Sequence, residues 1–328
     1  MLKKPDDATL QEGRVVQEHL GRYIVSAGDR LVGCAISSKL RKALEYPTAD
    51  PSSLRQRVIA VRRIPSVSPV ALGDLVAFED TGADKGMIYQ VLNRRNRLSR
   101  RAAGRRPLEH TLIANLDLAI LVFSIRQPDL HFWLEMLDRF LAICEMEEIP
   151  PLICLNKIDL AEEAAWRSAA SLYERIGYRT LPISAAHGTG VESVREAIRE
   201  AVSVFLGPSG TGKTTLLNAL QPGLGLQVGE VSRATGRGRH TTSHAELFPL
   251  EEGGMVGDTP GLRELNLYNV DADQLHWLFP EMRPLIGSCR FRNCIHAQEP
   301  DCAIKAAVES GQIDRLRYQS YLRIRERP

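Results

Sequence analysis

The pattern of apolar and polar positions divides the chain into two regions. Over the first hundred residues, short apolar runs are separated by turn residues such as Gly21 and Gly73-Asp74, which is typical of successive β-strands. From Leu112 onwards, apolar runs alternate with longer amphipathic segments. This alternation indicates βαβ units and a mostly parallel sheet with helices on both faces. The predicted strands cover residues 13–16, 23–26, 31–36, 58–61, 75–78, 87–92, 117–123, 151–155, 180–184, 202–206, 245–250 and 255–257. The predicted helices cover residues 132–146, 162–176, 191–202, 215–220 and 309–327.

The strand-rich first region predicts a small closed β-barrel. About five or six short strands are enough for one such barrel, and the OB-fold is the commonest small barrel that handles nucleic acid. A different small barrel without a ligand is the alternative. The barrel is followed at residues 93–106 by seven arginines. Because arginine forks match phosphate geometry, we interpret this run as an RNA backbone contact rather than only a solvated face.

Residues 207–214 read Gly-Pro-Ser-Gly-Thr-Gly-Lys-Thr and fit the phosphate-loop pattern G-x-x-x-x-G-K-[ST] without a mismatch. They stand between a predicted strand and a predicted helix, which is the context that the pattern needs. Lys213 is expected to reach the β- and γ-phosphates, and the Thr214 hydroxyl to bind Mg²⁺. The alternative is a glycine-rich turn that opens an ordinary helix. The predicted phosphate-binding residues are Gly207, Pro208, Ser209, Gly210, Thr211, Gly212, Lys213, Thr214 and Thr215.

Asn156-Lys157-Ile-Asp159 follows the strand at 151–155 and suggests recognition of guanine. A carboxylate at Asp159 would accept hydrogen bonds from guanine N1–H and N2–H₂, while the Lys157 stem packs on the base. Adenine lacks these donors and would leave the carboxylate unpaired. Ser184-Ala185 ends the next strand, where a backbone N–H could meet guanine O6. The alternative is a lysine–aspartate turn after a strand.

Asp258-Thr-Pro-Gly261 ends the strand at 255–257 and would face the other side of the phosphates. Asp258 is expected to hold Mg²⁺ through a water, and the Gly261 N–H to meet the γ-phosphate. Residues 233–242 are rich in glycine and arginine and suit a first switch, in which Thr241 or Thr242 would close on Mg²⁺.

Four potential zinc ligands lie close together near the C-terminus: Cys289, Cys294, His296 and Cys302. Three thiolates and an imidazole are a ligand set that Zn²⁺ favours in a closed tetrahedral site. We therefore predict one structural zinc ion per chain, with unrelated free thiols as the alternative. The other three cysteines stand singly in apolar runs and are interpreted as core residues.

Charge is unevenly distributed over the 328 residues, although the net charge is only +2. Residues 1–110 carry 20 Lys and Arg against 12 Asp and Glu, and residues 281–328 carry 9 against 6, whereas the middle of the chain is acidic. Basic flanks favour a polyanionic partner. The first residues lack the apolar core of a signal peptide, and the longest apolar run is far too short to span a membrane. We expect a cytoplasmic protein without membrane contact.

The order of these motifs is unusual, because the base-recognition motif precedes the phosphate loop. Circular permutation preserves such a site, since its geometry depends on where strand ends lie in the sheet. The chain resembles the circularly permuted, ribosome small-subunit-dependent GTPase A family, bacterial factors of late 30S maturation. The departures are minor: Thr211 and Thr214-Thr215 replace the more usual Val and Ser-Ser. The resemblance rests on residues 73–76, 156–159, 207–215, 238–242, 258–261 and 289–302.

The resemblance implies three domains: an OB-fold RNA-binding domain over residues 1–108, a circularly permuted α/β P-loop GTPase core over 109–275, and a small zinc-binding helical domain over 276–328. It implies a monomeric enzyme that uses GTP with Mg²⁺, releases GDP and phosphate, and is stimulated by the 30S subunit through its rRNA. A P-loop kinase-like enzyme with a basic barrel is the alternative, and an RNA-binding scaffold with a vestigial nucleotide site is a third possibility.

The residue after the Asp-Thr-Pro-Gly motif is Leu262, where many GTPases carry a water-orienting glutamine. Leucine cannot polarise water, so unaided hydrolysis should be slow. His240 in the first switch is the predicted substitute, since a neutral imidazole can orient an attacking water. The alternative is that His240 only faces solvent or phosphate. Lys213 and Thr241 complete the predicted catalytic set.

Overall fold

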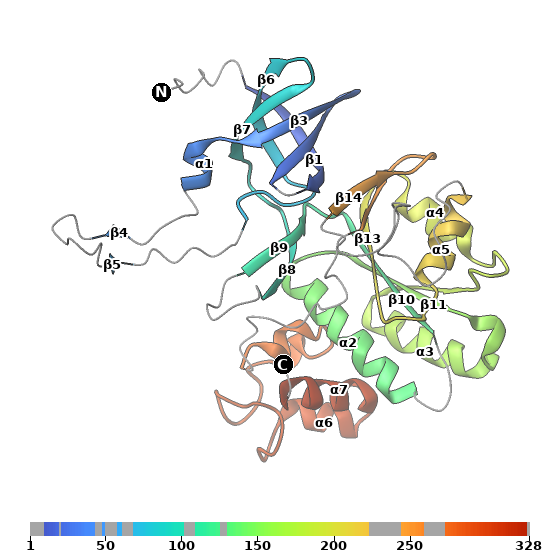
Figure 1. The fold of residues 1–328 in the computed structure, drawn as a ribbon. Helices are drawn as coiled ribbons and strands as arrows, with labels where there is room; N and C mark the ends of the chain where they lie inside the picture. The colour runs from blue at the N-terminus through green and yellow to red at the C-terminus, as the bar shows by residue number, and fades with distance from the viewer. Residues whose placement is uncertain are drawn as a thin grey trace. The chain divides into compact units, whose positions relative to one another are not determined.

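The computed structural model describes residues 10–19, 21–42, 48–49, 58–60, 68–101, 109–124, 130–222, 244–258 and 273–326. Within it the chain forms two compact units. The first comprises residues 1–116, 240–248 and 257–262, and the second comprises residues 117–239, 249–256 and 263–328. Figure 1 shows the ribbon, with the N-terminal strands in blue and the C-terminal helices in red.

The first unit contains a closed five-stranded barrel. Its strands follow the order β1-β2-β3-β7-β6, and β6 pairs again with β1 (Figure 1). The pairs are antiparallel except that of β3 with β7, which is parallel. A five-stranded barrel with a short helix after its third strand is the arrangement of an OB-fold, so the barrel prediction is confirmed. The elements of this unit are β1 (Gln11–His19), β2 (Arg22–Ala27), β3 (Arg30–Ile36), α1 (Ser38–Lys42), β4 (Thr48–Ala49), β5 (Val58–Ala60), β6 (Leu75–Gly82), β7 (Lys85–Val91), β8 (Arg97–Arg101), β9 (Glu109–Ala114) and most of β14 (His244–Pro249).

Apolar side chains on alternate strand positions fill the barrel. The core includes Val15, Val25, Phe78 and Ile88, all fully buried. Because successive strand residues point to opposite faces, the short alternating runs of the sequence are sufficient to produce this core. The strand β14, which the sequence analysis placed in the α/β alternation, pairs antiparallel with β1 of the barrel.

Part of the arginine run has a structural role at the exit of the barrel. Arg94 forms a two-pronged ion pair with the buried carboxylate of Asp74, at 2.7 and 2.8 Å. Asp74 also accepts a hydrogen bond from the Ala71 N–H at 2.7 Å. The following residues form β8, which pairs with β9 in a hairpin that the sequence analysis did not predict. The run is therefore partly a strand, and Arg94 is not available as an RNA contact.

The second unit has a sheet in the order β12-β11-β10-β13-β15, in which β10 to β13 are parallel. Along β10 the side chains alternate between faces: Ile120 and Val122 share a core cluster with α4 and α5, whereas the ring of Phe123 packs edge-on against Phe140 of α2. The predicted parallel α/β core is confirmed. Its elements are β10 (Leu118–Ser124), α2 (Leu130–Met146), β11 (Pro151–Asn156), η2 (Ile158–Leu160), α3 (Glu163–Ile176), β12 (Arg179–Ile183), α4 (Val191–Ile198), β13 (Val202–Leu206), α5 (Lys213–Leu220) and β15 (Met255–Asp258).

The C-terminal tail belongs to the second unit and packs on α2 through its last helix. It consists of short helical turns, a segment without regular structure, and two helices (Figure 1). The guanidinium of Arg317, only 1% exposed, forms ion pairs with Asp138 of α2 and with Glu281. The elements are η5 (Leu275–Leu278), η6 (Arg283–Leu285), α6 (Ala303–Glu309) and α7 (Arg315–Glu326). No helix in the described part of the chain is long and apolar enough to cross a membrane.

Candidate nucleotide site and metal centre

The parallel strands place the predicted nucleotide motifs at one edge of the sheet. Chain order reverses at β10, which lies between β11 and β13. In open α/β sheets, ligands bind outside the carboxyl ends of the strands at such a reversal. Residues 156–159 begin at the last residue of β11, residues 184–187 follow β12, and the phosphate loop follows β13. The sheet therefore brings together motifs that are far apart in the sequence.

The phosphate loop is fitted closely to its neighbours, which explains two of its glycines. Gly207 has φ 134° and Gly212 has φ 95°, both in the left-handed region that favours glycine. A Cβ atom at Gly207 would lie 2.2 Å from the Val122 carbonyl oxygen, and one at Gly212 would lie 2.3 Å from Asn156 Nδ2. No larger residue fits at either position without displacing β10 or the base motif.

The side chain of Lys213 folds back onto the phosphate loop. This side chain is buried, and its Nζ donates hydrogen bonds to the carbonyl oxygens of Gly207 at 2.7 Å and Pro208 at 2.6 Å. The buried Thr214 is the second residue of α5, and the N-terminus of a helix carries a partial positive charge. Phosphate oxygens would compete with the two carbonyls for the ammonium group.

The remaining residues of the predicted loop complete this turn. Thr211 is fully buried, and its Oγ1 donates to the Pro208 carbonyl oxygen at 3.0 Å. Ser209 and Gly210 lie on the exposed side of the loop, and Thr215 is half-buried in the first turn of α5.

Asn156 connects the base motif to the phosphate loop. Its Nδ2 donates to the Thr211 carbonyl oxygen at 2.8 Å, and its Oδ1 accepts from the N–H groups of Lys157 at 2.9 Å and Ala185 at 3.0 Å. Lys157 extends across the loop, where its Nζ donates to the Gly210 carbonyl oxygen at 2.6 Å. One buried amide thus joins three segments of the permuted site.

Asp159 is prepared to act as an anionic acceptor. Ser184 Oγ donates a hydrogen bond to Asp159 Oδ1 at 2.5 Å, and this bond lowers the pKa of the Asp159 carboxyl. The group is therefore ionised at neutral pH and suits the N1–H and N2–H₂ donors of guanine.

The predicted contact to guanine O6 meets a competing bond at both backbone positions. The Ser184 N–H donates to the Thr189 carbonyl oxygen at 2.9 Å, and the Ala185 N–H donates to Asn156 Oδ1. A hydrogen bond from either N–H to a guanine oxygen must share or replace one of these bonds.

The other side of the predicted site falls largely outside the described residues. The backbone of Asp258 ends β15, but its side chain is not described. Gly261, Leu262 and the predicted switch residues His240, Thr241 and Thr242 also lie outside the described part of the chain. Their roles remain predictions. As oxygen donors, the hydroxyl of Thr214 and the carboxylate of Asp258 are the ligand type that Mg²⁺ prefers.

The four predicted zinc ligands converge in the tail. The ligand atoms of Cys289, Cys294, His296 and Cys302 all lie within 4.8 Å of one another. The Sγ atoms of Cys289 and Cys302 are 3.8 Å apart, and His296 Nδ1 is 3.4 Å from each of them. A tetrahedron with ordinary zinc bond lengths has edges of about 3.8 Å between sulfurs and about 3.5 Å between sulfur and nitrogen. The donor set therefore fits a tetrahedral zinc ion.

The surroundings of the cluster also suit a closed structural site. Burial raises the pKa of the Cys294 thiol to about 12 and lowers the pKa of His296. A metal ion would reverse the first effect by stabilising the thiolate. The loop that carries the ligands is held by Tyr318 and Tyr321 of α7, whose hydroxyls donate to the carbonyl oxygens of His296 at 2.7 Å and Ile295 at 2.8 Å.

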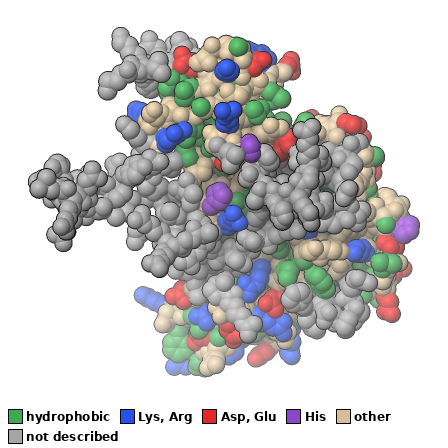
Figure 2. Space-filling model, viewed as in Figure 1, with side chains coloured by type: hydrophobic (Ala, Val, Ile, Leu, Met, Phe, Trp, Pro, Cys, Tyr) green, Lys and Arg blue, Asp and Glu red, His purple; other side chains and the backbone are tan. Residues whose placement is uncertain are grey.

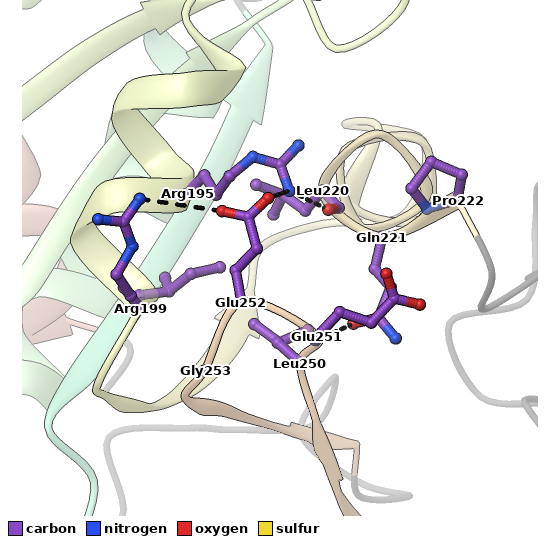
Figure 3. Close-up of a pocket in the computed structure, with 10 residues that line it drawn as sticks. Arg195, Arg199, Leu220, Gln221, Pro222, Leu250, Glu251, Glu252 and Gly253 are labelled. Carbon is purple, nitrogen blue, oxygen red and sulfur yellow. Dashed lines mark hydrogen bonds and ion pairs between the residues drawn. The ribbon is translucent and has the colours of Figure 1, made fainter.

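A cavity of about 220 Å³ lies at the opposite end of α5 from the phosphate loop. Figure 3 shows Glu252, in the turn between β14 and β15, reaching toward Arg195 of α4 and Arg199, which follows that helix. Arg195 also donates to the carbonyl oxygens of Leu220 and Ala219, so it satisfies the C-terminal end of α5. This cavity is separate from the nucleotide site, and its arginine fixes the position of the helix that carries Lys213.

Sequence reasoning missed two structural contributors near these sites. It did not identify Asn156 as the residue that joins the phosphate loop to the base motif, although the motif itself was recognised. It also missed Arg317 and Asp138, which are 179 positions apart and fix the tail against α2. A lone aspartate in the apolar stripe of residues 132–146 was the available signal, because buried carboxylates are almost always paired.

Comparison with known proteins shows the family. A family model described as RsgA GTPase matches residues 91–268. A protein named small ribosomal subunit biogenesis GTPase RsgA from Moorella thermoacetica is 38% identical over 311 residues, covering 95% of each chain. A protein of the same name from Gemmatimonas aurantiaca is 42% identical over 261 residues, covering 78% of this chain and 84% of that protein.

Two solved structures agree over nearly the whole chain. The crystal structure of YjeQ from Thermotoga maritima has a TM-score of 0.72 and 28% identity, covering 97% of this chain and 98% of that one. YloQ, described as a circularly permuted GTPase, has a TM-score of 0.70 and 28% identity, covering 99% and 97%. The predicted family and the permuted GTPase fold are confirmed. The chain is a GTPase and belongs to the RsgA GTPase family.

Proposed function

We propose that this protein binds GTP at the edge of the parallel sheet, docks on the small ribosomal subunit, and acts in late maturation of that subunit. The observation that carries the nucleotide part is the junction at Asn156, which joins the base motif to Thr211 of the phosphate loop. The ribosomal part rests on relatives of 38% and 42% identity, whose names state small ribosomal subunit biogenesis.

In this proposal the side chains and helix ends of the protein position the nucleotide and place positive charge beside its phosphates. The β- and γ-phosphates take the place of the Gly207 and Pro208 carbonyl oxygens as partners of Lys213, and the N-terminus of α5 supplies further N–H donors. Mg²⁺, held by Thr214 and Asp258, would neutralise charge that develops between the phosphates. Asp159 accepts hydrogen bonds from the guanine base.

The proposed catalytic group is His240, because Leu262 replaces the usual water-orienting residue. A neutral imidazole at His240 would orient the attacking water, and Thr241 would close on the metal. Docking on the subunit would bring the first switch into the reactive arrangement. The isolated protein is therefore expected to hydrolyse GTP slowly.

Exposed basic and aromatic side chains support docking on rRNA. On the face drawn in Figure 2, Lys and Arg side chains are visible both on the barrel and on the C-terminal tail. Between the zinc ligands Cys289 and Cys294, the loop exposes Arg290, Phe291 and Arg292, and the Arg290 guanidinium lies 5.6 Å from the centroid of the Phe291 ring. An aromatic ring beside guanidinium groups is typical of surfaces that stack unpaired bases.

Subunit-stimulated hydrolysis is the direct test. GTP hydrolysis should rise by orders of magnitude on addition of small subunits at low salt, as with other activated GTPases, and this stimulation should weaken as salt rises. Large subunits serve as the control. His240→Ala should lose most of the stimulation but still bind GTP and the subunit. Absence of acceleration by small subunits contradicts the ribosomal proposal, whereas equal acceleration of the alanine variant removes only the role of His240.

Base recognition has a separate test. Asp159→Asn should bind GTP weakly and shift its preference toward xanthine nucleotides, because the amide donates where the carboxylate accepted. The control is Asp29→Asn, the same substitution in an exposed turn. Unchanged GTP affinity in Asp159→Asn contradicts the base-site assignment.

A further inference from the structure

His187 lies in a short closed turn directly after β12, beside the carboxylate of Asp159. The Ser184 N–H donates to the Thr189 carbonyl oxygen at 2.9 Å, and the His187 N–H donates to the Ser184 carbonyl oxygen at 3.2 Å. The turn therefore fixes the backbone of His187. Its side chain is 67% exposed, so the imidazole is open to solvent.

The two oxygens of Asp159 have different neighbours. Oδ1 accepts the Ser184 hydroxyl proton at 2.5 Å, whereas Oδ2 lies 3.7 Å from His187 Nδ1. Since Ser184 has one proton and donates it to Asp159, its oxygen must accept from His187 Nδ1 at 3.1 Å. His187 Nδ1 therefore carries a hydrogen and faces both the serine oxygen and Oδ2 of the carboxylate.

We propose that His187 is a specificity-determining residue of the nucleotide site: its protonated ring competes with the guanine amino group for Asp159 Oδ2. This inference rests on the proposed contact between Asp159 and guanine. The neutral ring donates its Nδ1–H to the Ser184 oxygen at 3.1 Å and places no charge beside Oδ2. The imidazolium adds a positive charge at the same oxygen, so recognition of the guanine amino group weakens as His187 gains a proton.

Two charged groups stand near the His187 ring and its contact with Asp159. Asp159 is the carboxylate that faces the ring, and Lys157 is the other charged group that acts on Asp159. Hydrogen bonding to Ser184 keeps the pKa of the Asp159 carboxyl low, so this carboxylate stays ionised. Histidine is the side-chain type whose charge ordinarily changes within the pH range of the experiment below.

Comparison of GDP with IDP isolates the contact between Asp159 and the guanine amino group. Hypoxanthine keeps the N1–H and O6 of guanine but lacks its amino group, and both nucleotides carry identical phosphates. The ratio of their dissociation constants therefore cancels phosphate titration and long-range charge effects. Dissociation constants for both nucleotides are measured at about pH 5.5 and pH 8, across the ordinary histidine range, on the full-length parent and two variants.

The parent should discriminate GDP from IDP about three- to fivefold less well at the lower pH, which is the range expected for an exposed ion pair. His187→Gln keeps a hydrogen-bond donor without charge, so its ratio should be high and independent of pH. His187→Lys is charged throughout, so its ratio should be low at both values.

Three results overturn the inference. If the parent discriminates strongly but equally at both pH values, or if His187→Gln shows the same pH dependence as the parent, His187 has no such role and the guanine contact stands. If no protein discriminates at either pH, the proposed contact of Asp159 with the guanine amino group fails as well.

Discussion

The buried arginine of α7 allows the sharpest prediction about stability. Arg317 is only 1% exposed, its Nε lies 2.7 Å from Glu281 Oε1, and it also pairs with Asp138, which is equally buried. Its guanidinium carbon lies 4.6 Å from the centroid of the Phe279 ring. Replacement by methionine keeps much of the side-chain volume but removes the charge shared by the two carboxylates.

The expected loss of stability follows from the two carboxylates, Asp138 and Glu281, that the substitution leaves without their arginine. Removing one partner of a buried ion pair costs about 3–5 kcal/mol, because the remaining charge is buried and uncompensated. In a unit of roughly 200 residues, each kcal/mol lowers Tm by about 2–4 °C. Arg317→Met should therefore unfold about 6–20 °C below the parent, as measured by circular dichroism at neutral pH.

The matched control is Arg323→Met on the same helix. Arg323 is 50% exposed and pairs with Glu135 of α2 at 3.3 Å, so the same substitution removes an exposed ion pair between the same two helices. Exposed pairs contribute about 0–1 kcal/mol, so Tm should fall by no more than about 4 °C. If the Tm of both variants lies within about 4 °C of the parent's Tm, the buried network does not fix the tail and the reasoning is refuted.

Three further changes test other parts of the structure. Gly212→Ala places a Cβ 2.3 Å from Asn156 Nδ2 and should weaken GTP binding about tenfold or more, a loss of at least about 1.4 kcal/mol. The control is Gly210→Ala, whose Cβ meets nothing within 4 Å and which should lose less affinity. Equal losses of GTP affinity in a fluorescence titration contradict the steric argument. Metal analysis should find one zinc ion per parent chain and none in Cys294→Ser, which should retain nucleotide binding. If the parent protein is free of zinc after purification without chelators, the assignment of the zinc site is wrong. Burial and Asp74 raise the pKa of Glu18 from 4.5 to about 7, so this group destabilises the folded barrel increasingly as pH rises through that interval. Glu18→Gln should therefore be about 1–3 kcal/mol more stable than the parent at pH 8 but not at pH 4, as measured by urea unfolding, and an equal difference at both pH values contradicts the assignment.

The strands of the barrel show how far the sequence alone could predict the fold. All six strands expected in the first hundred residues exist with small shifts of their ends, because alternation of apolar residues and the turn glycines are local properties of the chain. The β8–β9 hairpin was missed because its first strand, β8, lies within the arginine run, where charge hides the strand pattern. The pairing of β14 with β1 was missed because it joins segments more than 200 positions apart.

The candidate site also has features that the sequence predicts and contacts that only the structure reveals. The sequence by itself determined the chemistry: a phosphate loop, an Asn-Lys-x-Asp motif, and a Cys₃His cluster whose four members lie within 14 residues. Only the tertiary structure decided which groups meet, such as Asn156 with Thr211, 55 positions apart, and His187 with Asp159. Local backbone preferences and side-chain periodicity are set by neighbouring residues, so a sequence displays them directly. Contacts between distant segments depend on strand order and on the packing of the whole core, and these are established only when the chain has folded.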